Sequence, residues 1–286
     1  MTRARDLADA ADKDFSGTVT VDNITIGGNI SQDSGTVKLD GNYPTGSNNV
    51  ALGDTALDDG SLSGGNNVAI GQASLTANTS GSENIAVGKS ALEANTTGGS
   101  NTAVGHRALD NNTTANYNTA VGFRALDANS TGAENTALGT FSLDANTTAS
   151  YNTGVGYGTL SENTTGPHNT AVGHTALLSN TTGDSNVAIG STALDVNTTG
   201  SANTAVGYTA LGATTTGIRN TGLGAYALAS NTTANYNTAI GFYALQSNTT
   251  GTENAAVGYN ALNSVTDSTA NTGVGHNSRC INHNWR

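Results

Sequence analysis

The 286-residue sequence contains one cysteine, two prolines and only 11% charged residues. A single cysteine excludes an intrachain disulfide framework. No apolar run approaches the roughly 18 residues typical of a membrane-spanning helix, so we expect no membrane insertion. The net charge of −11 and the pI near 4.5 disfavour nucleic acids and anionic membranes as partners, because both are negatively charged themselves. The first residues also lack the apolar stretch of a secretory signal.

Large apolar side chains are scarce as well. Leu, Val, Ile and Phe together number 49 of 286 residues, about 17%, whereas glycine alone contributes 37 residues. Chains below roughly 20% in these apolar types usually bury too little surface to order themselves. The composition therefore argues against an ordinary enzyme with a thick three-dimensional core.

A 17-residue repeat dominates the sequence from residue 49 onward. Its consensus is N-T-A-V-G-x-x-A-L-x-x-N-T-T-G-x-x, and its opening Asn occurs 14 times from Asn49 to Asn271, with one step of 18 residues and then steps of 17. Position one is always Asn, position five always Gly and position four always aliphatic, while position nine is Leu in the 13 copies that retain it. Position three is only Ala or Gly, and position eight only Ala, Ser or Thr.

One copy has too few large apolar side chains to fold alone, so the copies are expected to stack and bury their aliphatics between neighbours. Positions two and four share one face of a predicted β-strand, Gly at position five suits a corner, and N-T-T-G is typical of a turn. The A-L segment at positions eight and nine fits either a second short strand or a helical turn. The sequence predicts an all-β fold, a parallel β-solenoid or left-handed β-roll of about 14 rungs, with positions four and nine buried.

The small residues at positions three and eight predict that another surface packs closely against the stack. The simplest arrangement has several chains around one axis, with Ala and Gly where the backbones meet. We therefore predict a homotrimer in which Ala120 and Ala171 lie between chains. A single stack with this face exposed is the alternative.

Three regions are predicted. Residues 1–48 form an N-terminal cap or attachment segment, with a short helix over Thr2–Lys13 and short strands between Gly17 and Asp40. Residues 49–276 form the repeat shaft. Residues 277–286 form a C-terminal tail or cap with Trp285 as an apolar lid, because the last rung of a solenoid otherwise exposes unpaired edge groups.

Aromatic and imidazole rings recur at position six. On a solvent-facing edge they would stack on sugars of a surface ligand; between chains they would fill a groove, which is the favoured interpretation. The row consists of His106, Phe123, Tyr157, His174, Tyr208, Phe242 and Tyr259, with His276 in the last copy and Tyr226 and Tyr243 beside it at position seven.

No arrangement of residues indicates catalysis, a cofactor or a metal. Gly88-Lys89-Ser90 resembles the end of a phosphate-binding loop, but Glu83 stands where that loop needs its first glycine. His276, Cys280 and His283 do not have the spacing of a zinc site. We predict that the protein is not an enzyme.

Two further rows have simple structural interpretations. Position ten is acidic in six copies, and we expect a solvated stripe rather than a calcium row, because other copies have Leu, Gly or Ala there. Ten copies contain an Asn-x-Ser/Thr sequon at position twelve. Stacked Asn amides that bond from rung to rung explain these sequons more simply than glycosylation. The acidic residues are Asp58, Glu93, Asp110, Asp127, Asp144 and Asp195.

The motif resembles two families of fibrous proteins. N-V-A-I-G at residues 67–71 and 186–190 is similar to the head repeat of trimeric autotransporter adhesins, which form left-handed parallel β-rolls of three chains. The full 17-residue form resembles shaft repeats of phage tail-fibre and tail-spike-like proteins. R-A-R-D-L-A-D-A-A at residues 3–11 and V-T-V-D-N-I-T-I-G-G-N-I at residues 19–30 are similar to segments of marine phage tail fibres. The adhesin family implies a signal peptide and a membrane barrel, neither of which the sequence displays.

The resemblance therefore implies a rigid trimeric shaft of a phage tail fibre or similar virion appendage that contributes to host attachment. Its partners would be copies of itself, other fibre or tail proteins at one end, and a host surface glycan. A bacterial surface adhesin or a self-assembling extracellular filament is the main alternative. An ice-binding solenoid is a minor one, because position two mixes Thr with Val and Ile and most Thr lies in the turn.

Overall fold

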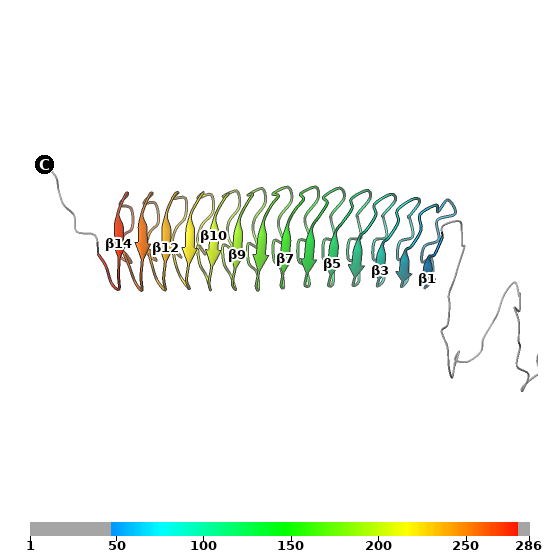
Figure 1. The fold of residues 1–286 in the computed structure, drawn as a ribbon, viewed down its shortest axis with the longest axis horizontal. Helices are drawn as coiled ribbons and strands as arrows, with labels where there is room; N and C mark the ends of the chain where they lie inside the picture. Colours follow the sequence, from blue (N-terminus) through cyan, green and yellow to red (C-terminus); the bar gives the residue numbers. More distant parts are fainter. Residues whose placement is uncertain (1–46, 280–286) are drawn as a thin grey trace, which may run out of the picture. The chain divides into compact units, whose positions relative to one another are not determined.

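The computed structural model describes residues 47–279, which form a rod built from stacked coils (Figure 1). Each repeat contributes one three-residue strand, and all strands belong to a single parallel sheet in chain order. The predicted β-solenoid is therefore confirmed. The strands are β1 (Val50–Leu52), β2 (Val68–Ile70), β3 (Ile85–Val87), β4 (Thr102–Val104), β5 (Thr119–Val121), β6 (Thr136–Leu138), β7 (Thr153–Val155), β8 (Thr170–Val172), β9 (Val187–Ile189), β10 (Thr204–Val206), β11 (Thr221–Leu223), β12 (Thr238–Ile240), β13 (Ala255–Val257) and β14 (Thr272–Val274).

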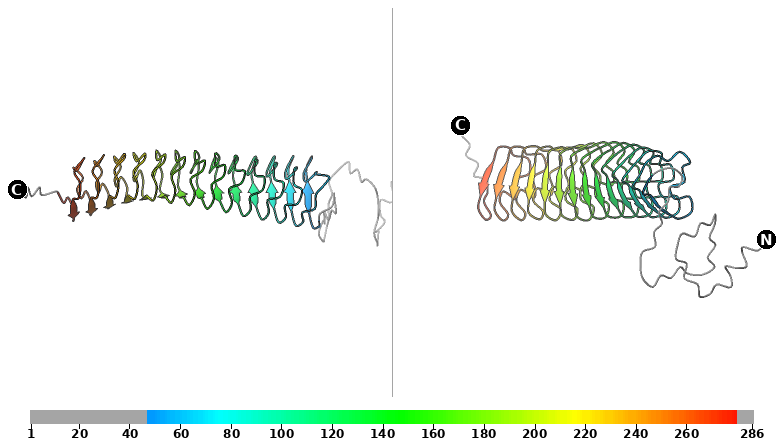
Figure 2. Two further views of the ribbon diagram at one scale, coloured as in Figure 1. Left: turned by 90° about the horizontal axis from the view of Figure 1, so that it is seen from above. Right: turned by 45° about the vertical axis from the view of Figure 1, so that its right-hand side comes forward.

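Strands pair in strict register along the rod. Val50 pairs with Val68 across the one 18-residue step, and every later pair joins residues 17 apart, such as Ala103 with Ala120. The views of Figure 2 show the coils following one another along the whole rod. No helix long enough to cross a membrane occurs in residues 47–279. The predicted cap, apart from its last two residues, and the tail from Cys280 to Arg286, with Trp285, lie outside the described residues.

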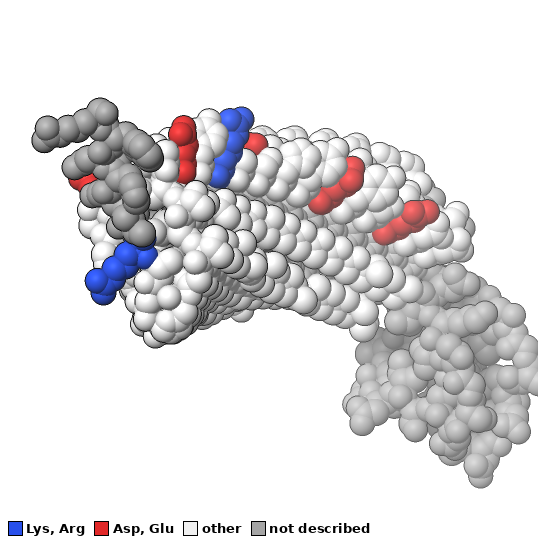
Figure 3. Space-filling view, turned by 60° about the vertical axis from the view of Figure 1, so that its left-hand side comes forward, with Lys and Arg blue, Asp and Glu red and all other residues white. Residues whose placement is uncertain are grey.

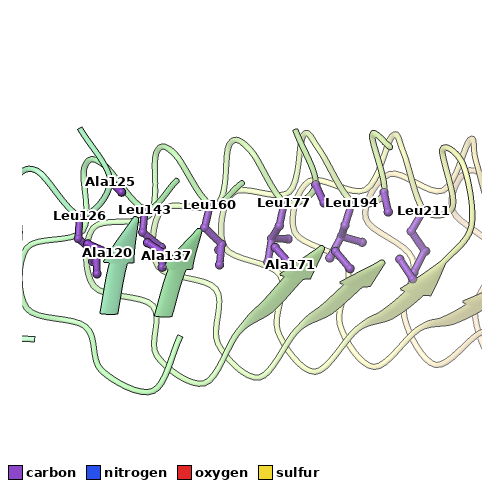
Figure 4. Close-up of a cluster of buried hydrophobic side chains, with 14 of the residues drawn as sticks. Ala120, Ala125, Leu126, Ala137, Leu143, Leu160, Ala171, Leu177, Leu194 and Leu211 are labelled. Carbon is purple, nitrogen blue, oxygen red and sulfur yellow. The ribbon is translucent and has the colours of Figure 1, made fainter. Parts of the chain in front are cut away.

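The interior of the rod is a single file of Leu and Ala side chains. Leu at position nine is at most 1% exposed in all 13 copies, which confirms the prediction for that position. Position three of the strand points inward toward these leucines, and the Ala residues at positions three and eight fill the remaining space (Figure 4). The contact is close: a Cβ added to Gly273 would lie 2.5 Å from Leu262 Cγ.

Two predictions about the strand are wrong. Position four is not buried, since Leu138 and Leu223 are 46% and 44% exposed. The small residues do not lie between chains, because Ala120 and Ala171 are 0% exposed within one chain. A coil of 17 residues encloses so narrow an interior that one Leu per rung fills it, and the strand position facing that Leu must be small. Positions two and four consequently face outward.

The A-L segment is neither strand nor helical turn. Leu at position nine adopts φ of about +50°, between 49° and 55° in all copies, and position seven is also left-handed. Such φ values cost free energy in non-glycine residues. Hydrogen bonds to both neighbouring rungs hold the turn in place: Leu92 N donates to Ala108 O at 3.0 Å, and Ser90 N donates to Gln72 O at 2.9 Å.

Two columns of buried Asn side chains tie the coils together. At position one, Asn84 Oδ1 accepts from the backbone N of Asn101 at 3.0 Å, and Asn84 Nδ2 donates to Gly98 O at 2.9 Å. At position twelve, Asn95 Nδ2 donates to Asn78 Oδ1 at 3.0 Å and to Gly98 O at 3.0 Å. The predicted amide ladder is confirmed. The sequon amides are 0–1% exposed, so the folded chain does not present them to a glycosyltransferase.

Candidate functional site: an aromatic ladder and a charge-free sheet face

All seven rings predicted at position six lie on the surface of the rod. Together with the rings at position seven they form two stacked runs, which we call the aromatic ladder. The first run extends from His106 to His174, with ring centroids of successive members 5.3–6.1 Å apart. The second extends from Tyr208 to His276, with separations of 4.0–6.1 Å. Ser191 and Thr192 separate the two runs.

Position seven keeps the ladder continuous where position six is small. Thr140 and Ala225 occupy position six in two rungs, and there Phe141 and Tyr226 supply the ring from position seven. Phe141 lies 5.3 Å from Phe123 and meets it edge to face at 87°. The row predicted from the sequence does not include Phe141. The sequence does contain a signal for it, because in these two rungs a small residue at position six is followed directly by a ring at position seven.

A second set of exposed rings at position seventeen was also overlooked. Tyr117, Tyr151 and Tyr236 are 65%, 51% and 47% exposed, and Tyr151 stacks on His168 with centroids 4.9 Å apart. These rings do not extend through consecutive rungs as the ladder does. Because they are exposed rings outside the ladder, they are suitable matched controls for variants of the ladder.

The outer side of the sheet forms the second candidate surface, which we call the charge-free sheet face. It consists of positions two and four of all 14 strands, and these 28 positions contain only Thr, Val, Ile, Leu and Ala. Thr occupies position two in nine strands, including five in succession from β4 to β8. In the view of Figure 3, charged side chains are few, and most of the visible surface of the rod is uncharged.

Position ten contains a partly buried acidic row instead of a solvated stripe. Asp127 is only 3% exposed, and Arg124 Nε lies 2.7 Å from its Oδ2 and Arg107 Nε lies 3.4 Å from its Oδ1. Arg107 Nε also contacts Asp110 Oδ2 at 2.8 Å. Two arginines thus offset the repulsion among stacked carboxylates. No cluster of three metal-binding side chains occurs in the described part of the chain, and Cys280 and His283 lie outside it.

Burial raises the pKa of Asp195, although hydrogen bonds from backbone N–H groups oppose the shift. An acid whose pKa is raised in the folded state lowers stability when it is ionised, and the loss is recovered as pH falls toward the unfolded pKa of about 3.9. We therefore expect Asp195→Asn to be more stable than the natural chain at pH 7, with an advantage that shrinks as pH falls toward about 4 and is lost below it. Urea unfolding across this pH range measures it.

Asp59→Asn is the control of opposite sign. Hydrogen bonds from the side chain and backbone of Ser61 lower the pKa of Asp59, so its carboxylate stabilises the fold above the unfolded pKa and loses that effect as pH falls. This variant should be less stable at pH 7. Equal pH profiles for the two variants would contradict the assigned directions.

No protein-family model, curated protein or solved structure matches this chain.

Proposed function

We propose that the protein is a rigid structural shaft in a fibre, a trimeric component of a phage tail fibre or similar virion appendage that contributes to host attachment. The observation that supports a shaft is the unbroken in-register stack of 14 rungs. At about 4.8 Å between strands, its 13 intervals give a rod roughly 60 Å long. Assignment to a virion rests on the resemblance of the repeat.

Stiffness follows from how many bonds join each pair of rungs. The strand, the left-handed turn and the N-T-T turn all donate backbone hydrogen bonds to adjacent coils, and Thr96 Oγ1 adds a bond to Thr113 O at 3.0 Å. Two buried Asn columns run parallel to these bonds. Bending the rod would stretch several ladders at once. Such an element suits a spacer between an attachment point and a recognition point.

The aromatic ladder is the surface through which we propose that three copies associate. Its members Phe123, Tyr157, Tyr208 and Tyr259 are 41–51% exposed, and removing apolar surface from water contributes about 25 cal/mol per Å². Aromatic side chains are enriched in protein interfaces. Three ladders converging on one axis would cover rings that a single chain leaves in contact with water.

Measurement of mass in solution tests this assembly. Light scattering on the purified full chain at micromolar concentration is expected to give three times 28.5 kDa. The double variant Phe123→Ser/Tyr157→Ser should run as a monomer with an unchanged far-ultraviolet dichroism spectrum. The control Tyr117→Ser/Tyr151→Ser, which removes two exposed rings outside the ladder, should remain trimeric.

Two outcomes would contradict the proposal. A well-folded natural monomer would refute the trimer, and electron micrographs showing compact or flexible particles in place of straight rods would refute the shaft. The rival biology, a bacterial surface adhesin or extracellular filament, is separated by the genomic neighbourhood: tail and baseplate genes support a virion fibre, and secretion genes support the rival.

A further inference from the structure

The charge-free sheet face has hydroxyl groups that the protein itself does not use. Thr at position thirteen donates its hydroxyl to the next rung, as Thr147 Oγ1 does to Thr164 O at 3.1 Å. In residues 47–279, none of the nine Thr hydroxyls at position two has a hydrogen-bond partner in the protein. The same residue type thus serves the rod at one position and points to solvent at the other.

The spacing of this face is fixed in two directions. In-register pairing places position-two groups about 4.8 Å apart along the rod, and positions two and four lie about 6.6 Å apart along each strand. Each strand except β13, which has Ala255 at position two, therefore presents one β-branched group beside one aliphatic group, repeated over roughly 60 Å. The strands from β1 to β14 lie side by side along the rod (Figure 1), and the view from above in Figure 2 shows them turning gradually from one end to the other.

Three features distinguish water as the ligand from a protein partner. A typical protein interface contains about ten direct hydrogen bonds, whereas none of these 28 positions provides a charged or amide group for them. Charged groups also impose their own geometry on nearby water, which would disturb an ordered layer. Regular rows of hydroxyl and methyl groups hold water in place, the hydroxyls by hydrogen bonding and the methyl groups by enclosing it, and both rows repeat with the same spacing from rung to rung.

We propose that the charge-free sheet face binds ice, with the five consecutive Thr–Val or Thr–Leu rungs from β4 to β8 at its centre. The hydroxyls of Thr119 and Thr136 bond to the outermost lattice waters, and the methyl groups of Val121 and Leu138 occupy gaps between them. Where position two is Val or Ile, the row keeps its shape and loses only a hydroxyl. This activity goes beyond the proposed shaft function and requires only that the sheet face stays exposed in the assembly.

Thermal hysteresis and inhibition of ice recrystallisation, measured on the purified full chain, test the proposal. The natural protein is expected to shape growing ice crystals and to separate melting from freezing temperature. Thr136→Tyr places a ring on the face and should remove most of this gap. Thr131→Tyr changes an exposed Thr of the preceding rung outside the sheet face and should leave it unchanged.

Both variants should keep the natural dichroism spectrum and the natural mass in solution, so that failure of ice binding is separable from failure of the shaft or trimer. Absence of hysteresis and of crystal shaping in the natural protein overturns the proposal. Equal activity of Thr136→Tyr and Thr131→Tyr overturns the assignment to the sheet face. Dissociation of the assembly by Thr136→Tyr also overturns it, because the face would then lie between chains.

Discussion

Leu143→Asp is expected to unfold the centre of the rod. Leu143 is 0% exposed and lies in the single file of leucines, so the variant loses apolar packing and buries a carboxylate without a counter-ion. Loss of a buried Leu side chain alone typically costs about 2–5 kcal/mol, and an uncompensated buried charge costs a similar amount. Unfolding in urea should show a loss of about 5 kcal/mol or more, and amide hydrogen exchange should accelerate most in the adjoining rungs.

Leu138→Asp is the matched control from the same rung. It introduces the same charge five residues away, at position four, where the side chain is 46% exposed. We expect it to change the stability of the single chain by less than about 1 kcal/mol. The sequence pattern alone predicted equal burial at both sites. Equal destabilisation by the two variants would therefore support burial of both positions and contradict the observed orientation of the strand.

Gly122→Ala is expected to interrupt the stack. Gly122 has φ of +138°, and a Cβ placed on it would lie 2.5 Å from Gly139 O and 2.6 Å from Gly139 C of the next rung. The backbone must therefore shift in two coils while one residue keeps a φ that side chains rarely adopt. Such strain costs about 1–3 kcal/mol before any clash is counted, so thermal or urea unfolding should reveal a loss of at least about 3 kcal/mol.

Gly158→Ala separates the two contributions. Gly158 also has a positive φ, +61°, but its added Cβ would be no closer than 3.5 Å to a neighbouring atom. Ala73 adopts the same conformation at the same position, so this variant should cost at most about 1–2 kcal/mol. If Gly122→Ala proved as mild as Gly158→Ala, contact between glycines of successive rungs would not explain the invariance of position five.

Close contact alone does not demand glycine. A Cβ on Gly98 at position fifteen would lie 2.4 Å from Ala115 O, yet position fifteen is alanine in Ala115, Ala149 and Ala234. There φ is not positive, and a small shift makes room for the methyl group. Position five combines a close contact with a left-handed φ, which accounts for glycine in all 14 copies.

The sequence by itself determined the architecture. A period of 17 residues is too short for a unit with its own core. Asn and Gly at fixed positions in all 14 copies, and Leu at position nine in 13 of them, demand identical neighbours above and below. Stacking in register follows from that identity, and so do the amide ladder at position twelve and the burial of position nine. The aromatic row at position six was also evident, because the repeat aligns its members.

Tertiary structure alone decided which face of the strand is inside. Period-two alternation places positions two and four opposite position three, but it does not say which side meets the core. Side-chain size predicts the wrong orientation of the strand, because large aliphatics favour burial and small residues leave room for another chain. The width of the coil determines which face of the strand points into the rod. Leu at position nine, held in a left-handed turn that propensity does not anticipate, fills the interior from the opposite wall and leaves space for only Ala or Gly on the strand. The aliphatic and Thr rows are therefore turned to the outside.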